Sequence, residues 1–119
     1  MTSGNLKQVT QEFSGQVWKG IEKLDRLGME CCEFHSGSEK GPGRAHEEFR
    51  DYLKRTKNTI CGRHPIGVLL GALSELEKEK EGSGGGARLE WKRYEQSSRV
   101  EGMRDSSVSY ASAVITFSQ

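Results

Sequence analysis

The stretch Pro65–Leu76 (PIGVLLGALSEL) is the most apolar run of the chain, and it decides the fold. Proline suits the first position of a helix, where a backbone N–H would have no partner in any case. The apolar residues that follow leave hardly any polar face, a pattern typical of a helix enclosed by other elements. We therefore predict a buried helix from Pro65. It ends through the charged residues 75–81 and the glycine-rich residues 82–86.

Two further helices are predicted before this run. Apolar residues recur at helical spacing from Phe13, Ser14 is suited to cap the helix, and the pattern fades near Cys31. Residues 35–44 are rich in glycine and serine and predict a mobile surface loop. A second helix is expected over Ala45 to Lys57.

Two strands are predicted at the end of the chain. Residues 88–93 alternate in polarity, with Leu89 and Trp91 on one face, as in a half-exposed strand. Residues 108–117 are apolar on both faces, which is typical of a central strand covered on both sides. Two strands and three helices cannot cover such a strand and also enclose an apolar helix. We therefore expect the chain to pair with another subunit or with a part of its sheet that is missing here.

Composition narrows the class of protein. The chain has 119 residues, enough for one small domain, but only 33% are hydrophobic and 29% are charged. A net charge of +1 without a basic stripe argues against nucleic-acid binding, and no apolar run is long enough to span a membrane. Three cysteines do not form a disulfide framework, so a reducing compartment is expected, either the cytoplasm or the nucleus.

Cys61 is the first candidate for chemistry. It lies just before the predicted helix, where free backbone N–H groups and the helix dipole favour an anion. Arg63 and protonated His64 add positive charge, so a thiolate is stabilised as a nucleophile or metal ligand. A buried structural cysteine beside a helix cap is the alternative. His64 can be a ligand or an acid–base group, but a structural role as the residue that caps the helix is favoured.

A second polar cluster precedes the last strand. Asp105 can bond the following backbone N–H groups in a turn, and Ser106 and Ser107 offer hydroxyls to an oxyanion or water. The adjacent pair Cys31 and Cys32 is best explained by packing, since neighbouring helical residues point in different directions. One cysteine with one nearby histidine does not make a complete metal site.

These segments resemble the C-terminal region of Memo-family proteins, which are named for a mediator of receptor-kinase-driven cell motility. The similar segments are residues 58–70 (NTICGRHPIGVLL), 96–98 (QSS) and 105–111 (DSSVSYA). The resemblance implies an α/β fold related to the class III extradiol dioxygenases, a mixed sheet with flanking helices, here incomplete. Residues 1–14 are then a flexible lead-in and 15–119 part of a single domain, with mobile inserts near 36–48 and 79–87. The histidine-bearing N-terminal half of the family has no counterpart here.

The resemblance also implies a site and a function. Cys61 corresponds to a ligand of copper or iron, with Arg63, His64, Asp105, Ser106 and Ser107 placed around the metal or at an anion. The implied function is metal binding linked to redox signalling, and whether it includes an enzymatic activity stays open. The alternative is a non-enzymatic adaptor for phosphotyrosine peptides or a receptor tail. Either role needs the missing N-terminal half or another subunit.

Overall fold

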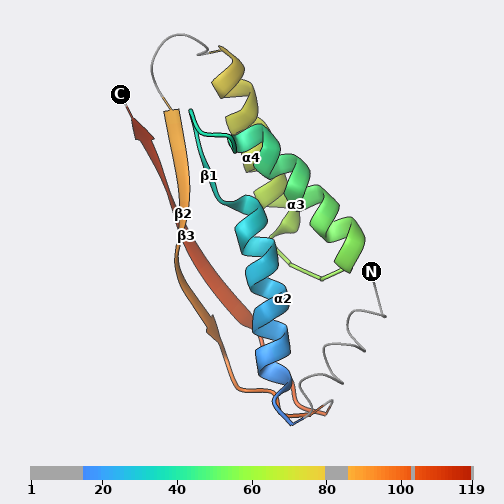
Figure 1. The fold of residues 1–119 in the computed structure, drawn as a ribbon. Helices are drawn as coiled ribbons and strands as arrows, with labels where there is room; N and C mark the ends of the chain where they lie inside the picture. The colour runs from blue at the N-terminus through green and yellow to red at the C-terminus, as the bar shows by residue number, and fades with distance from the viewer. Residues whose placement is uncertain (1–14, 80–85, 103, 119) are drawn as a thin grey trace.

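The computed structural model describes residues 15–79, 86–102 and 104–118, and these form three helices beside a three-stranded sheet. The elements are, in order, α2 (Val17–Cys32), β1 (Phe34–His35), α3 (Pro42–Thr56), α4 (Arg63–Glu79), β2 (Gly86–Gln96) and β3 (Ser109–Ser118) (Figure 1). The predicted α/β class is confirmed.

The helices begin at other residues than the sequence pattern indicated. α3 starts at Pro42 instead of Ala45, because proline suits the first turn, where its missing N–H costs nothing. The loop expected through residue 44 therefore ends at Gly41, and Ala45 is fully buried. α4 starts at Arg63, with Pro65 inside its first turn. The expected cap Ser14 lies outside the described residues, and Gln16 is the N-cap of α2.

The three strands form one antiparallel sheet in the order β1-β2-β3. The short β1 was not predicted; it pairs Phe34 with Leu89 of β2. β3 lies at the edge of this sheet, and the expectation of a central strand is wrong for the described residues. Its apolar pattern shows which side chains favour burial, but no described strand lies beyond it to make it central.

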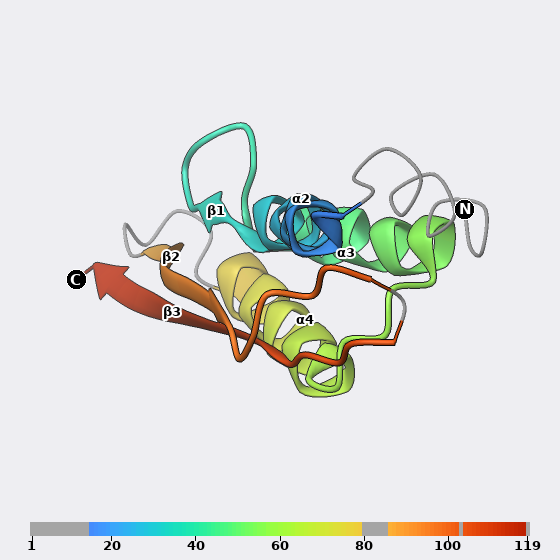
Figure 2. The same cartoon turned by 90° about the horizontal axis from the view of Figure 1, so that it is seen from below.

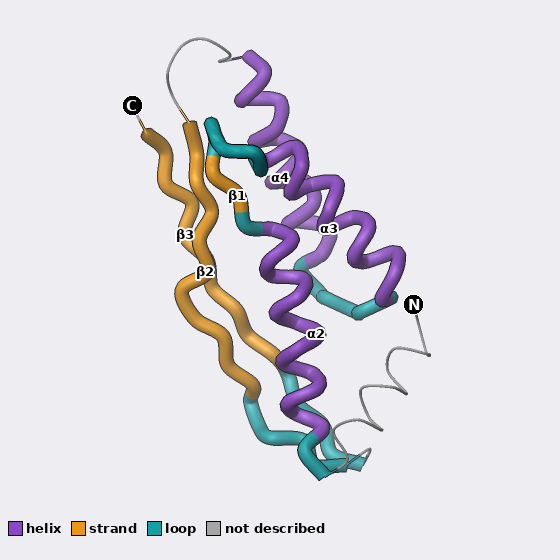
Figure 3. Tube along the Cα trace, in the orientation of Figure 1, coloured by secondary structure: helices purple, strands orange, loops and turns teal. Residues whose placement is uncertain are grey.

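All three helices lie on one side of the sheet (Figures 1 and 2). α3 packs between α2 and α4, and α2 also contacts β2. The core combines helix residues such as Phe49, Tyr52 and Leu70 with Phe34 and Leu89 from the sheet. The tube in Figure 3 shows β2 and β3 running together along the length of the molecule, beside α2.

α4 is less enclosed than its sequence predicts. Only Leu70 and Leu73 of this helix are buried, whereas Val68, Leu69 and Leu76 are exposed. The prediction of a helix buried on most sides is therefore wrong for this chain, because α3 and the core cover one face of α4 only. None of the helices described is both long and apolar enough to cross a bilayer.

Candidate metal-ligand site

Cys61 lies in the tight turn that connects α3 to α4. The turn is closed by two backbone hydrogen bonds, from Arg63 N–H to the Ile60 carbonyl (3.0 Å) and from Ile66 N–H to the Gly62 carbonyl (3.0 Å). Cys61 is exposed, two residues before the first residue of α4. Its thiol is therefore open to solvent beside the end of a helix where the dipole is positive.

The other two cysteines have different surroundings. Cys31 and Cys32 are the last two residues of α2, and Cys32 is fully buried in the core. Burial raises the pKa of Cys32 to about 12, and burial also raises the pKa of Cys31. Both thiols therefore stay protonated at neutral pH, as expected for cysteines that serve packing. Of the three cysteines, Cys61 alone is open to an incoming ligand.

The neighbours of Cys61 are partly engaged in holding the turn. The Arg63 guanidinium donates from Nη1 to the Ile60 carbonyl at 2.9 Å, so it braces the backbone on which Cys61 sits. His64 is exposed in the first turn of α4. The structure thus gives Arg63 a structural contact and leaves His64 at the surface next to Cys61.

Asp105, Ser106 and Ser107 stabilise a different loop. The Asp105 carboxylate accepts hydrogen bonds from the N–H groups of Glu101 (3.0 Å) and Gly102 (3.3 Å). Both donors precede Asp105 in the chain, whereas the sequence pattern predicted donors that follow it. Ser107 Oγ donates to the Ser98 carbonyl at 2.9 Å. This loop joins β2 to β3 at one end of the molecule, whereas the Cys61 turn lies further along the long axis (Figure 1). The structure does not bring the two candidate clusters together.

A polar network behind the Cys61 turn was missed from the sequence. Asn58, three positions before Cys61, donates from Nδ2 to Asp25 Oδ1 (3.2 Å) and to the hydroxyl of Tyr52 (2.9 Å). Tyr94 of β2 donates to the other Asp25 oxygen at 2.6 Å, and burial together with this bond raises the pKa of Tyr94 to about 12. The network fixes the connection before α4 to α2 and to the sheet. No local motif announces it, because its members are far apart in the chain.

The described residues fit one metal ligand, not a complete site. They contain no group of three or more histidine, cysteine, aspartate or glutamate residues arranged to hold a metal. Copper and iron accept a cysteine thiolate, but a stable site needs several donors. Cys61 therefore meets the chemical and geometric requirements of a single sulfur ligand, and any further ligands have to come from elsewhere.

Comparison with known proteins gives one consistent match. A family model described as Memo-like protein matches residues 1–114. The rat protein MEMO1 is 43% identical over 105 residues, which cover 88% of this chain and 31% of the rat protein. The human protein MEMO1 is 42% identical over 105 residues, with the same coverage of 88% and 31%. The yeast MEMO1 family protein MHO1 (Saccharomyces cerevisiae) is 39% identical over 100 residues, covering 84% of this chain and 27% of that protein. The chain thus spans less than a third of the length of these relatives.

Proposed function

Because this chain belongs to the Memo-like family, we propose that it supplies Cys61 as one ligand of a copper or iron ion in redox-linked signalling. The remaining ligands come from the missing N-terminal half of the family's domain or from another subunit. The observation that supports this most is the contrast between the three cysteines: Cys61 is exposed at the start of α4, and the other two belong to α2.

The position of Cys61 suits a thiolate ligand for physical reasons. The N–H groups of Arg63 and Ile66 donate to turn carbonyls and Pro65 has no N–H, so the support for a negative charge at Cys61 comes mainly from the dipole of α4. A thiolate is the form that binds metal, and it is a soft ligand suited to copper(I) and to iron. When bound, such a metal supplies one-electron chemistry. The role of this chain is to hold the sulfur at a fixed place through the braced turn over residues 60–63.

The adaptor alternative has less support in the geometry. It requires Arg63, the start of α4 and the two serines at 106 and 107 to meet one phosphate. Arg63 is bonded to the Ile60 carbonyl, and both serines belong to the loop between β2 and β3. A peptide pull-down with phosphorylated and plain tyrosine peptides tests it, and equal capture of the two peptides would remove this alternative.

The metal proposal is tested by a copper(I) competition assay with a colorimetric chelator. The samples are the wild-type chain, Cys61→Ser and Cys31→Ser, each alone and mixed with the portion of human MEMO1 that this chain does not match. We expect Cys61→Ser to weaken binding in the mixture by more than roughly tenfold, since even the loss of a residue that only orients a ligand costs about that much. Cys31→Ser serves as the matched control and should bind like the wild type. Equal copper affinity of Cys61→Ser and wild type would refute the ligand assignment.

A further inference from the structure

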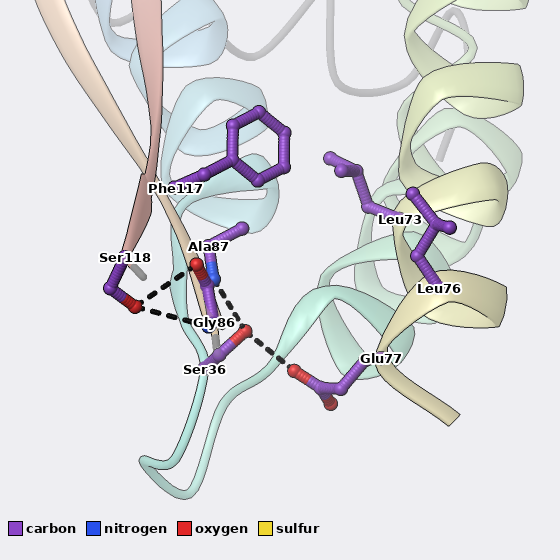
Figure 4. A pocket seen from close by; sticks show the side chains of 8 residues that line it. All are labelled: Ser36, Leu73, Leu76, Glu77, Gly86, Ala87, Phe117 and Ser118. Atoms are coloured by element: carbon purple, nitrogen blue, oxygen red, sulfur yellow. Dashed lines mark hydrogen bonds between the residues drawn. The ribbon is translucent and has the colours of Figure 1, made fainter. Parts of the chain in front are cut away.

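Ser36, the residue directly after β1, joins β1 to β2 and to α4 (Figure 4). Its hydroxyl donates to Glu77 Oε2 of α4 at 2.6 Å and accepts from the Ala87 N–H of β2 at 3.1 Å. Its own backbone N–H donates to the Ala87 carbonyl at 2.9 Å. Because a hydroxyl can donate one hydrogen bond and accept others, this one side chain connects a strand and a helix. We call these three hydrogen bonds the Ser36 junction.

The Ser36 junction is packed closely on two sides. A Cβ atom built on Gly86 would lie 2.9 Å from the Cβ atom of Ser36, so the backbone of β2 lies directly against this serine. A Cβ atom built on Gly41 would lie 2.9 Å from Glu77 Oε1, so the backbone at Gly41 lies directly against the carboxylate. Glu77 therefore cannot move toward Gly41 to make room for a larger group on Ser36.

The space beside the Ser36 hydroxyl does not suit an anion. It is a cavity of about 50 Å³ between α4 and the sheet, with leucine and phenylalanine side chains in its lining (Figure 4). Of the described residues that line this cavity, Glu77 alone is charged. A phosphate placed next to a carboxylate disrupts the local structure, because like charges repel and both groups lose water. A phosphate on Ser36 would therefore find apolar side chains and a like charge.

The loop that begins with Ser36 is accessible to an enzyme. Gly37, Ser38 and Glu39 are exposed, and Gly37 has a φ of 85°, which places a tight turn at the surface. Glu39 is the third residue after Ser36. Kinases that prefer acidic substrates select a serine by a carboxylate at this position, which complements their own basic residues. Ser38 has Gly41 at the corresponding position, so the sequence favours Ser36 over its neighbour.

We propose that Ser36 is a phosphorylation site and that its phosphorylation breaks the junction between α4 and the sheet. An acidophilic serine/threonine kinase transfers the γ-phosphoryl group of ATP to Ser36 Oγ. A bond forms between Oγ and phosphorus, the bond from this phosphorus to the ADP oxygen breaks, and the hydroxyl proton passes to a base of the kinase. The proposal does not depend on the metal site, because Glu77 lies near the last residue of α4 and Cys61 precedes its first.

Phosphorylation acts on the hydrogen bonds of the Ser36 junction. It removes the proton that Ser36 donates to Glu77 and places a charge of about −1.5 to −2 beside this carboxylate. Surface loops of folded proteins open locally without global unfolding, and the kinase modifies Ser36 in this open state. The modified serine cannot return to its place between Glu77 and Ala87. The loop over residues 36–41 therefore stays open, and the end of α4 separates from β2.

The first experiment determines whether Ser36 is modified. The wild-type chain, Ser36→Ala, Ser38→Ala and Glu39→Gln are incubated with an acidophilic kinase of the casein-kinase type, ATP and Mg²⁺, and phosphorylated residues are located by mass spectrometry. We expect phosphate on Ser36 in the wild type and in the matched control Ser38→Ala. Glu39→Gln should react at least about tenfold more slowly, because a hydrogen bond to a charged group is lost. No phosphate on Ser36 in the wild type, or an unchanged rate for Glu39→Gln, would overturn the assignment of the site.

The second experiment measures whether the junction breaks. Amide hydrogen exchange is followed by NMR in the phosphorylated and the unmodified wild-type chain. We expect the Ser36 amide to exchange at least about tenfold faster after phosphorylation, because its hydrogen bond to Ala87 is lost. The Lys57 amide, which donates to the Leu53 carbonyl at 2.9 Å at the end of α3, is the control and should be unchanged. Unchanged exchange at Ser36, or equal acceleration at Lys57, overturns the breaking of the junction.

Glu77→Gln tests whether charge repulsion causes the opening. The glutamine has no charge, and its amide can donate to a phosphate on Ser36. Phosphorylation should therefore accelerate exchange at Ser36 less in Glu77→Gln than in the wild type. An equal acceleration in both proteins would show that Glu77 has no part in the effect and would overturn the proposed mechanism.

Discussion

Replacing Gly28 by alanine tests the close approach of α2 and α3. A Cβ atom at this position would lie 2.7 Å from Cε1 and 2.9 Å from Cζ of Tyr52. The Tyr52 ring has no room to move, because it is fully buried and its hydroxyl donates to the Leu24 carbonyl at 2.6 Å. Alanine therefore forces the two helices apart or breaks this hydrogen bond.

The size of the effect follows from three terms. Overpacking a well-packed core costs about 1–3 kcal/mol. Loss of the hydrogen bond to the Leu24 carbonyl costs about 1 kcal/mol more. The better helix propensity of alanine offsets about 1 kcal/mol. The net loss in the free energy of unfolding is about 1–3 kcal/mol, which for a domain of this size lowers the melting temperature by about 4 °C or more.

Urea unfolding followed by circular dichroism measures this loss, and Gly67→Ala is the matched control. Gly67 lies inside α4, and no other group lies within 4 Å of a Cβ built there. The same substitution should therefore stabilise the protein at Gly67, by about 0.5–1 kcal/mol. Opposite signs at the two glycines are the expected result. A Gly28→Ala variant as stable as the wild type would show that the two helices are not in tight contact, and the reasoning would fail.

Two further predictions concern buried hydroxyl and thiol groups. Tyr52→Phe should lower the free energy of unfolding by about 1–3 kcal/mol in urea titrations, because the Leu24 carbonyl and the Asn58 amide each lose a partner; no change in the midpoint would contradict the network. The protein should also lose stability in alkali. Folding raises the pKa of Cys32 from 9.0 to about 12 and that of Tyr94 from 10.0 to about 12. Both groups are neutral when protonated, and burial favours this form. Their contribution to the free energy of unfolding is therefore full below the pKa of the unfolded state, and it is lost as the pH rises through the pKa of the folded state. The urea midpoint should therefore fall between pH 9 and 12, and a flat profile over that range would contradict the burial of these groups.

Local periodicity was sufficient to predict the elements that bury one face. The helical spacing that predicted the first helix matches the buried face of α2, which includes Val17, Leu24 and Gly28. The alternation around Leu89 correctly indicated a strand with one buried face. These predictions are reliable because the spacing of apolar residues in a helix or strand depends on local geometry alone.

Contacts between distant segments could not be predicted in this way. Asp25, Asn58 and Tyr94 meet in one network although they belong to a helix, a turn and a strand. The strand β1 is too short to produce a period, and its pairing with Leu89 depends on where the helices place it. The separation of Cys61 from Asp105 could not be predicted for the same reason. Each segment has a local polar pattern, but the distance between the two is set by the whole fold.

The two wrong predictions about burial are informative together. Val68 and Val114 have the chemistry of buried residues, and the chain leaves both exposed. Apolar periodicity indicates which side chains of a segment favour burial, whereas the structure shows which of them this chain buries. The apolar side chains that the chain leaves exposed are concentrated on α4 and β3, whereas a single exposed apolar residue such as Leu27 is common on protein surfaces. The exposed apolar residues of α4 begin next to the turn that carries Cys61, so the proposed metal ligand adjoins the part of the chain whose apolar side chains are least covered.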